Sequence, residues 1–506
     1  MAANDLLAPP TEAELNLCLS PGPGAAKPSA TLLSRRSCEH TPTWQRFNVR
    51  GRRFDQQFSH LYSKRYAQMK GATWAAARAR WANSGARAVE RIVQLKEGER
   101  TFCCGVLYKQ MKLRQSVIDE YQRELAISGA VYPLEDYTSS EDALDIEDDS
   151  GRMRLAGDVA ALPVHLLATG LTAAVLGVMG ADGEFVVEDW CVPGVPPPLE
   201  NTNGAVAPKA EPEGDEGPYL LLASGLGFGG ATDPMPAAML VDFVAGRLGG
   251  AADRSDVGAN ICRVILAGNS MAPLQDGERL RDKNLPAADQ ERIAGPLYQL
   301  DAMLAQLASA CPVDVMPGAD DASSVAMPQQ PFHRSLLPTA CRYSSLQRPP
   351  NPYEALVEGR LVLGSSGQPV TDLLKFTRPA APKPKGENDD GDDEGNATEA
   401  EGAAAADFTL SALERMLGWR HMAPTAPDTL PCYPFYNEDP FVLEHCPQVF
   451  FAGNQKAFGQ RLIDAPGGGK CLLLSVPKFD ETREAVLVNL RTLEASTLSF
   501  HADLLC

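Results

Sequence analysis

Five short loops rich in glycine, asparagine, aspartate and serine each follow an apolar run in the C-terminal part of the chain. They are SGLGFGG at 224–230, LAGNS at 266–270, MPGADD at 316–321, LGSSGQ at 363–368 and AGNQKAF at 452–458. Loops that end strands are where α/β proteins place catalytic and binding residues. These five loops are therefore the first place to look for catalytic residues and metal ligands.

The order of these loops resembles that of the calcineurin-like metallophosphoesterases. Active members carry Asp-x-His, Gly-Asp, Gly-Asn-His-Asp/Glu, a lone His with Gly, and Gly-His-x-His. The corresponding positions here are Gly225 and Gly227, Asn269, Ala319 and Asp320, Ser366, and Asn454 and Lys456. Glycine and alanine offer no ligand atom, and a lysine ammonium repels cations. The resemblance therefore implies a phosphoesterase-like domain with no catalytic residue, no metal and no other cofactor.

The histidines and cysteines support the same expectation. None of the seven histidines lies in the five loops, and His333 and His421 are predicted to be structural. No two of the twelve cysteines have CxxC spacing, so the sequence predicts neither a zinc nor an iron–sulfur site and suits a reduced, intracellular protein. The first residues, MAANDLLAPP, carry an early acid and no basic flank, so we expect no secretory signal.

The elements that position these loops change type along the chain. Helical spacing from 54 to 96 predicts two short helices, and short β runs follow, with Asp182-Gly183 as a hairpin turn. Short strands of this kind suit a small β-barrel such as an OB-fold, although the strand pattern alone does not separate it from other barrels. Beyond 218, strands alternate with helices and then strands return, which predicts a phosphoesterase-like β-sandwich flanked by helices. The expected fold class is thus α+β and α/β, with more than one domain.

Composition sets the expected boundaries. Residues 1–45, rich in Pro, Gly, Ala and Ser, are predicted to be a disordered tail. The helical segment and barrel occupy 46–195, a linker occupies 196–218, and the phosphoesterase-like domain occupies 219–506. Two acidic stretches, each with eight acids and no base, are predicted to be disordered: a loop at 135–149 and an insertion at 378–407 whose acids lie at 387–401.

Charge restricts the ligands. A net charge of −19 makes the whole chain a poor binder of nucleic acid or anionic membrane. Val159 to Ala181 has no charged residue, but its glycines and polar residues favour buried strands over a membrane span. Arg46 to Arg123 holds 17 Lys/Arg against six Asp/Glu. That excess is either a solvated face or a surface for an acidic partner or the DNA backbone.

Longer motifs narrow the resemblance to one family. SGLGFGG, RVILAGN, PVDVMPG, PQQPFH, NPYEA, SGQPVTDLL, HMAPTAPDTLPCYPFYNEDPF and CPQVFFAGN are similar to the B (second, small) subunits of DNA polymerase delta, from about residue 46 to the C-terminus. B subunits of the alpha and epsilon polymerases are the alternatives, and the PTAPDTLPCYPFY run favours delta.

The resemblance implies a non-catalytic scaffold in the nucleus. Its partners would be the cysteine-rich C-terminal domain of the catalytic subunit and a third subunit that reaches the sliding clamp, with DNA touched weakly or indirectly. Phe435 and Tyr436, in a proline-bounded aromatic cluster, are candidate partner contacts, with a packed loop as the alternative.

Three rival interpretations stay open at this point. Gly225-x-Gly227-x-x-Gly230 matches a dinucleotide-binding loop, but Pro234 and Pro236 interrupt the helix that should follow. An active phosphoesterase would have to rely on Asp320 or Asp321. The barrel could bind single-stranded DNA if its aromatic residues were exposed; those available are Phe102, Tyr108, Phe185 and Trp190, most of which we expect in the core.

Overall fold

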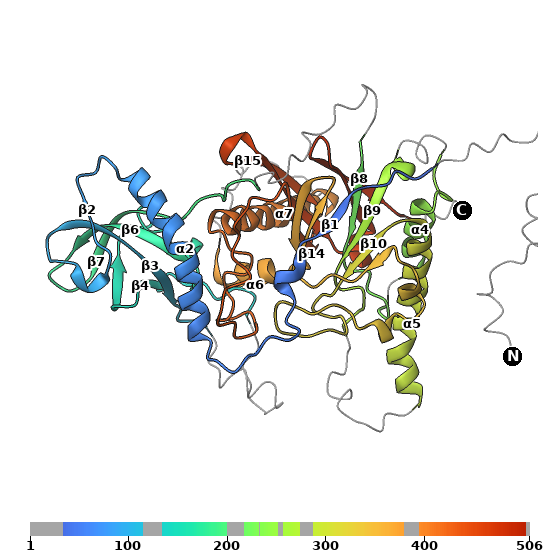
Figure 1. Cartoon of the computed structure of the whole chain (residues 1–506), viewed down its shortest axis with the longest axis horizontal. Helices are drawn as coiled ribbons and strands as arrows, with labels where there is room; N and C mark the ends of the chain where they lie inside the picture. Colours follow the sequence, from blue (N-terminus) through green and yellow to red (C-terminus); the bar gives the residue numbers. More distant parts are fainter. Residues whose placement is uncertain are drawn as a thin grey trace, which may run out of the picture. The chain divides into compact units, whose positions relative to one another are not determined.

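The N-terminal half folds as a closed β-barrel with a long helix packed on it (Figure 1). In this computed structural model, residues 34–114, 134–199, 217–231, 233–250, 257–273, 287–378 and 394–501 are described. The barrel strands are β2 (Arg87–Ala88), β3 (Arg100–Gln110), β4 (Ala143–Glu147), β5 (Arg152–Ala156), β6 (Thr172–Met179) and β7 (Phe185–Cys191). Their order is β2-β3-β4-β5-β7-β6, and pairing of β3 with β6 closes the barrel.

Helix α2 (Ser59–Arg80) covers β3 and β6. It buries Trp74 and Ala77 against Phe102 and Leu176 of the barrel. The two short helices predicted for 54–96 are wrong: one 22-residue helix runs through Gly71 and ends at Arg80, with Trp81 as its C-cap. An exposed glycine inside a helix costs only about 1 kcal/mol, and burial of one helix face outweighs that cost.

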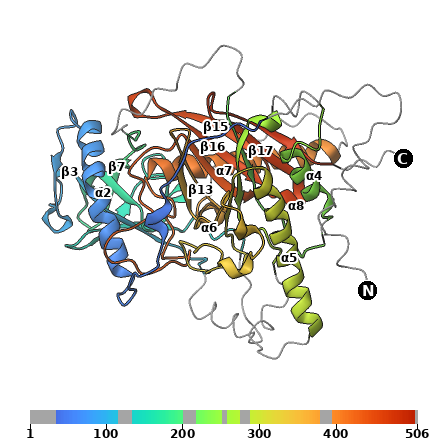
Figure 2. The same ribbon diagram turned by 45° about the vertical axis from the view of Figure 1, so that its right-hand side comes forward.

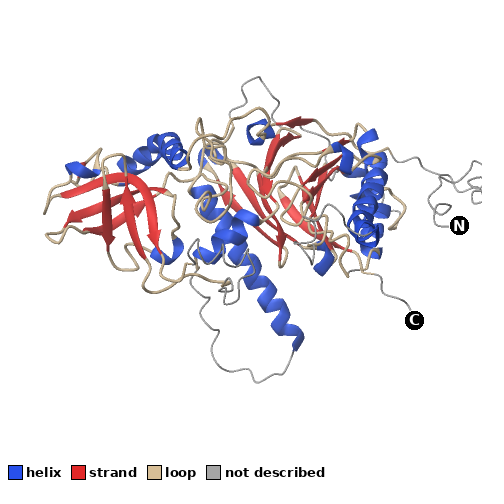
Figure 3. Ribbon diagram, turned by 90° about the horizontal axis from the view of Figure 1, so that it is seen from below, coloured by secondary structure: helices blue, strands red, loops and turns tan. Residues whose placement is uncertain are grey.

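Two further six-stranded sheets form a sandwich, as predicted (Figures 2 and 3). The first sheet has the order β1 (His40–Pro42), β12 (Tyr353–Val357), β13 (Arg360–Ser365), β14 (Val449–Gln455), β16 (Lys470–Pro477) and β15 (Gly459–Asp464). The second has the order β11 (Leu346–Gln347), β10 (Val313–Met316), β9 (Ile261–Ala267), β8 (Tyr219–Ala223), β17 (Glu484–Asn489) and β18 (Glu494–Ser499). Fully buried aliphatic and aromatic side chains such as Leu222, Ile265 and Phe451 fill the space between them.

Helices cover the outer faces of both sheets. α4 (Met235–Val244) and α5 (Ala287–Ala310) share a core with the second sheet, and α6 (Gln368–Phe376) and α7 (Glu394–Gly418) share one with the first. α8 (Phe479–Thr482) follows β16. Short 3-10 turns lie at Trp44–Phe47, Ile92–Gln94, Val164–Leu166, Gly258–Asn260, Arg334–Leu336, Ala340–Arg342 and Pro466–Gly468.

Three predicted disordered regions contain regular structure. The tail assigned to 1–45 includes β1, which pairs with β12 through His40 and Val357, and its first 33 residues lie outside the described part. The acidic loop at 135–149 contains β4, because Leu144 and Ile146 alternate with charged residues and face the core. The insertion at 378–407 overlaps α7 from Glu394 onward, while 379–393 are not described.

The structure also bears on the predicted hairpin and on the uncharged stretch predicted to form buried strands. The hairpin at Asp182-Gly183 is confirmed, since β6 and β7 pair antiparallel around it. The uncharged stretch from Val159 contains β6, and none of the helices in the described ranges has the length and apolar character that crossing a bilayer requires. Most of the predicted linker, 200–216, falls outside the described residues.

Candidate functional site

The five loops meet at one edge of the sandwich, where β8, β9, β10, β13 and β14 end. The backbone N–H of Gly225 donates to the Gly268 carbonyl at 2.9 Å, and the N–H of Gly227 donates to the Asn269 carbonyl at 3.3 Å. The amide nitrogen of Asn454 donates to the Ser366 carbonyl at 2.8 Å. The Asp320 N–H donates to the Asn269 side chain at 3.3 Å. The structure therefore brings together Gly225, Gly227, Asn269, Asp320, Ser366 and Asn454.

Close backbone approach explains the glycines between these residues. A Cβ on Gly268, whose φ is +82°, would lie 2.4 Å from the Ser366 Cβ. A Cβ on Gly225 would lie 2.8 Å from the Asn454 side-chain oxygen. Only glycine fits at such approaches, so the loops are packed against each other at these points.

A network of neutral amides occupies the buried side of this edge. The Asn351 amide nitrogen donates to Gln329 at 2.8 Å, to the Ser366 hydroxyl at 2.9 Å and to Gln368 at 2.9 Å. Its oxygen accepts the Ser366 N–H at 3.1 Å, and Gln368 donates to Gln329 at 2.7 Å. Gln329 also donates to the Gly318 carbonyl at 3.0 Å. The side chains thus satisfy one another without a charged group.

Asp321, beside this network, is almost fully buried. Its carboxylate accepts the backbone N–H groups of Met271 at 2.9 Å and Gly318 at 2.8 Å. Burial raises the pKa of Asp321 to about 6, although those N–H bonds oppose the shift. Both of its oxygens are committed to the backbone, so Asp321 acts as a loop clamp and not as a free ligand.

The exposed side of the edge carries two partly buried acids and one lysine. Burial raises the pKa of Asp320 and of Asp480, and the positive charge of Lys478 opposes both shifts. The Lys478 ammonium bonds Glu481 at 2.8 Å. A pair of divalent cations needs several anionic or imidazole donors. This edge offers neutral amides, an Asp321 carboxylate already bonded to backbone N–H groups, and the carboxylates of Asp320, Asp480 and Glu481 beside the Lys478 ammonium. The residues present do not fit a two-metal centre.

Two of the predicted positions do not contribute to this edge. Ala319 lies in the same loop as Asp320, but its exposed methyl group provides no polar atom. Lys456 is exposed and lines a different hollow of about 490 Å³, beside Phe458 and Glu484. The two side chains therefore have different surroundings, and the assignment of Asn454 and Lys456 to the positions of two histidines stays a prediction.

Phe435 and Tyr436, the predicted partner contacts, have different environments. Phe435 is buried and packs edge-on against Phe54 at 5.5 Å between ring centroids. Its assignment as a partner contact is wrong, because its ring is already covered within this chain. Tyr436 is half-buried and lines a hollow of about 340 Å³ with Arg52, Arg53, Phe54, Phe435, Asn437 and Glu438.

Buried charges join the barrel helix to the sandwich. The Arg65 guanidinium on α2 donates to the Asp439 carboxylate at 2.7 Å, to the Gly170 carbonyl at 3.3 Å and to the Pro424 carbonyl at 3.1 Å. The ring of His421 bonds the same carboxylate at 2.9 Å. Burial, together with Arg65, lowers the pKa of His421 to about 4, so the ring is neutral at pH 7 and structural, as predicted.

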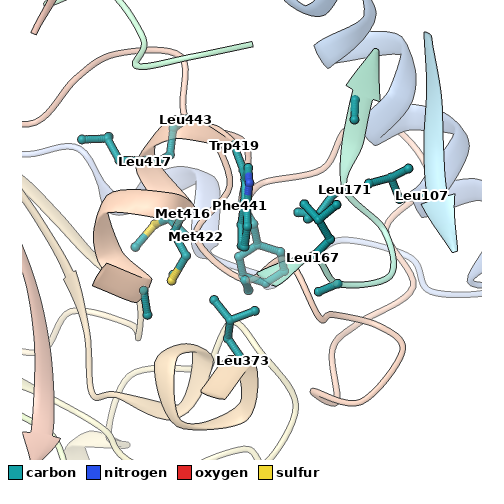
Figure 4. Packing of buried hydrophobic residues seen from close by; sticks show 14 of the residues in the cluster. Leu107, Leu167, Leu171, Leu373, Met416, Leu417, Trp419, Met422, Phe441 and Leu443 are labelled. Atoms are coloured by element: carbon teal, nitrogen blue, oxygen red, sulfur yellow. The ribbon is translucent and has the colours of Figure 1, made fainter. Parts of the chain in front are cut away.

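An apolar cluster continues this contact. Leu107, Leu167 and Leu171 of the barrel face Trp419 and Phe441 of the sandwich (Figure 4). Nearby, the buried Lys109 ammonium donates to the Phe376 carbonyl at 2.8 Å at the end of α6. The two folds therefore share one core and form a single compact unit, Arg35–Cys506.

A dinucleotide-binding loop at this position would need the backbone N–H groups of Gly225 and Gly227 to be free to bind phosphate. The N–H groups of Gly225 and Gly227 donate to the neighbouring 268–269 loop, and α4 begins only at Met235. A Gly-rich phosphate loop needs free N–H groups at a helix start.

The alternative in which the barrel binds single-stranded DNA requires exposed aromatic residues. Phe102 and Phe185 are buried, and the half-buried Tyr108 lies under Arg152, 4.5 Å from its ring centroid. Some of these bases pair with acids: Arg80 with Asp189, Arg91 with Asp149 and Arg100 with Glu188 elsewhere in the barrel, and Arg87 with Glu99 inside the same segment. Neither observation favours a nucleic-acid surface on this fold.

Sequence reasoning missed the amide network and the joint between the two folds. Asn351, Gln329 and Gln368 lie in the motifs NPYEA, PQQPFH and SGQPVTDLL, which were noted only as marks of resemblance. A buried polar side chain needs hydrogen-bond partners, so a polar residue inside an apolar motif was the sequence feature that could have indicated the network. Arg65 lies at helical spacing with Leu61 and Met69, which indicates the buried face of α2, but its partners are more than 100 residues away and no local pattern identifies them.

Two protein-family models and several known proteins match this chain. Residues 57–190 match the model described as DNA polymerase delta subunit OB-fold domain, and 220–460 match the one described as the B subunit of DNA polymerase alpha/epsilon. The DNA polymerase delta small subunit of Oryza sativa subsp. japonica is 34% identical over 473 residues, covering 92% of this chain and 99% of that protein. The Arabidopsis thaliana small subunit is 34% identical over 94% and 98%. Subunit 2 of Drosophila melanogaster is 32% identical over 90% and 96%.

Proposed function

Because the chain belongs to the family of DNA polymerase delta small subunits, we propose that it bridges the catalytic subunit and a third subunit and performs no reaction itself. The chain is an accessory subunit of the polymerase delta complex. It acts in the nucleus in DNA replication and in repair synthesis. Its contribution is geometric, since two partners held on one body meet at a raised effective concentration.

The observation that carries the proposal is the composition of the loop edge. A calcineurin-like enzyme would hold two cations there, but this chain presents an amide network around Asn351 and a lysine ammonium at Lys478. Glycines at 225 and 227 leave no side chain in the place of the first ligands. The edge is a former phosphoesterase site in which side chains that bonded metals have been replaced by side chains that bond each other.

The shared core of the two folds supports a scaffold role. A bridge transmits position only if its two ends do not move independently, and the buried Arg65–Asp439 pair with the Leu107 and Phe441 cluster joins them. One surface receives the cysteine-rich C-terminal domain of the catalytic subunit. Another receives the third subunit, and through it the sliding clamp. DNA is touched weakly or indirectly, in agreement with the net charge of −19.

Co-expression tests the assignment. The full chain is produced with the catalytic subunits of the delta, alpha and epsilon polymerases in separate cultures, and each pair is purified at high salt. We expect retention of the delta catalytic subunit, and of a third subunit when it is added. Retention of the alpha or epsilon subunit instead would overturn the assignment.

A variant pair tests the contact surface in the same assay. Tyr436→Ala removes a half-buried ring from the hollow beside Arg52 and is expected to weaken capture. Lys456→Ala, on the hollow beside Phe458, is the matched control and is expected to leave capture unchanged.

The enzymatic alternative has its own test. Hydrolysis of a generic phosphodiester is measured with manganese, with Asp320→Ala and Asp321→Ala as variants. We expect no turnover above background, and metal-dependent turnover lost in either variant would restore the phosphoesterase assignment.

A further inference from the structure

The N-terminal segment is held against β9 of the sandwich by contacts that end at a pair of thiols. The Arg35 guanidinium donates to the carbonyls of Gly258 at 3.0 Å and Ile261 at 2.8 Å. The Arg36 N–H donates to the Ala259 carbonyl at 2.9 Å, and β1 then pairs with β12 (Figure 1). These anchors place the Cys38 sulfur 3.7 Å from the carbonyl oxygen of Cys262.

The two thiols have different roles in their mutual contact. Their side chains hydrogen-bond to each other. That bond and the positive charge of Arg263 outweigh burial and hold the pKa of Cys38 below its ordinary value. The same bond and burial raise the pKa of Cys262 well above its ordinary value. Cys38 is half-buried and Cys262 is fully buried. A partly exposed thiol with a lowered pKa beside a fully buried thiol with a raised pKa is the arrangement of a reactive and a resolving cysteine.

An unsatisfied donor lies beside this pair. Arg263 is 5% exposed, and its guanidinium bonds Asp314 at 2.5 Å, but its Nε has no hydrogen-bond partner. A buried N–H without an acceptor is costly, and a negative charge on the neighbouring sulfur compensates it. Arg263 therefore favours the thiolate of Cys38 independently of the contact with Cys262, although Asp314 shares its charge and Glu358 opposes its effect.

We propose that Cys38 and Cys262 form a peroxide-sensitive thiol pair that, on oxidation, ties the N-terminal segment covalently to β9. The Cys38 thiolate attacks hydrogen peroxide, breaking the O–O bond to give a sulfenic acid and hydroxide. The Cys262 thiol then condenses with the sulfenic acid, forming the S–S bond and releasing water. Two thiols lose two hydrogens in all, and one peroxide becomes two waters. This modification does not depend on the scaffold role.

The chain contains a matched control pair. Cys446 and Cys471 also hydrogen-bond through their side chains, but both are buried, at 2% and 0% exposure. The causes of their pKa shifts include no neighbouring cation. If proximity of two thiols were sufficient, both pairs would oxidise; if access and a cation are required, only Cys38 and Cys262 will.

Peptide mass mapping of the reduced full chain after brief treatment with stoichiometric hydrogen peroxide tests the proposal. We expect a linked peptide joining Cys38 to Cys262, two hydrogens lighter than its reduced parts, and no linked Cys446–Cys471 peptide. Reaction of Cys38 should be at least tenfold faster than that of the half-buried single thiol Cys341, by order of magnitude.

Variants separate the two steps. Cys262→Ser should leave Cys38 as a sulfenic acid that dimedone labels, and Cys38→Ser should abolish both the link and the label. The thermal unfolding midpoint of each reduced variant, compared with the parent, reports whether it folds, and Cys38→Ala replaces Cys38→Ser if it does not. Equal oxidation rates at Cys38 and Cys341, or linking of Cys446 to Cys471 at the rate of the Cys38 pair, would overturn the proposal.

Discussion

Two buried aspartates of this chain have opposite protonation behaviour. Asp321, at the loop edge, has a pKa raised to about 6 because burial outweighs its bonds to backbone N–H groups. Burial also raises the pKa of Asp439, between barrel and sandwich, but Arg65 and His421 outweigh it and hold that pKa well below the ordinary value. Both carboxylates are almost fully buried, so the neighbouring Arg65 and His421 account for the opposite direction of the pKa shift at Asp439.

The joint between the two folds and the loop edge also differ in where their charged groups lie. Charge is concentrated where two folds must stay in register, and Arg65 there meets three carbonyls and a carboxylate. The edge where a phosphoesterase would concentrate charge is filled by neutral amides on its buried side. A buried ion pair is weak evidence for net stability but a strong constraint on geometry, which is what a joint requires.

Removing the cation from the joint should have the largest effect. In Arg65→Met, Asp439 keeps its buried carboxylate without a cation, and we expect a loss of about 3–5 kcal/mol of unfolding free energy. Chemical denaturation measures it. Lys64→Met, an exposed neighbour on α2, is the control and should change stability by less than about 0.5 kcal/mol. Equal losses in both variants would show that the buried pair has no special role.

Removing the carboxylate from the loop edge should change the pH dependence of stability. Asp321 titrates at about 6 when folded against 3.8 unfolded, so the folded state binds more protons between these values. Stability therefore falls as pH rises through this window, by about 3 kcal/mol at 1.36 kcal/mol per unit.

Asp321→Asn should remove that fall, and the measurement is the difference in unfolding free energy between parent and variant from pH 3.5 to 7. His421 contributes a slope of the opposite sign, since its folded pKa is depressed to about 4 from 6.5, but it is present in both proteins and cancels. A difference that does not vary with pH would contradict the raised pKa of Asp321.

Perturbing the neutral network should have the smallest effect. Ser366→Ala removes one hydroxyl, but the Asn351 amide keeps Gln329 and Gln368 as acceptors, so we expect a loss of about 1 kcal/mol. Lys456→Ala, on its separate exposed hollow, should cost less than about 0.5 kcal/mol in the same denaturation assay. A loss in Ser366→Ala as large as that in Arg65→Met would mean that the edge, like the joint, depends on a charged group.

Local pattern predicted the strands that carry the loops. The runs YLLLASG, CRVILAGN and VDVMPG became β8, β9 and β10 within one residue or two, because buried strands of a sandwich are apolar throughout. The local pattern did not predict strands β1 and β4, which lie in segments whose composition predicted disorder. β1 is a three-residue edge strand whose partner β12 lies over 300 residues away, and β4 lies in an acidic run yet buries Leu144, Asp145 and Ile146.

By itself, the sequence determined the order of folds, the positions of the five loops and the absence from them of the expected histidines. Those features depend on residue type and on periodicity within a few residues. Only the tertiary structure decided that Asn351, Gln329 and Gln368 fill the loop edge, that Lys456 lies away from it, and that Arg65 meets Asp439. The reason is physical: a polar side chain acquires its role from the partners that burial places within about 3 Å, and those partners come from distant parts of the chain.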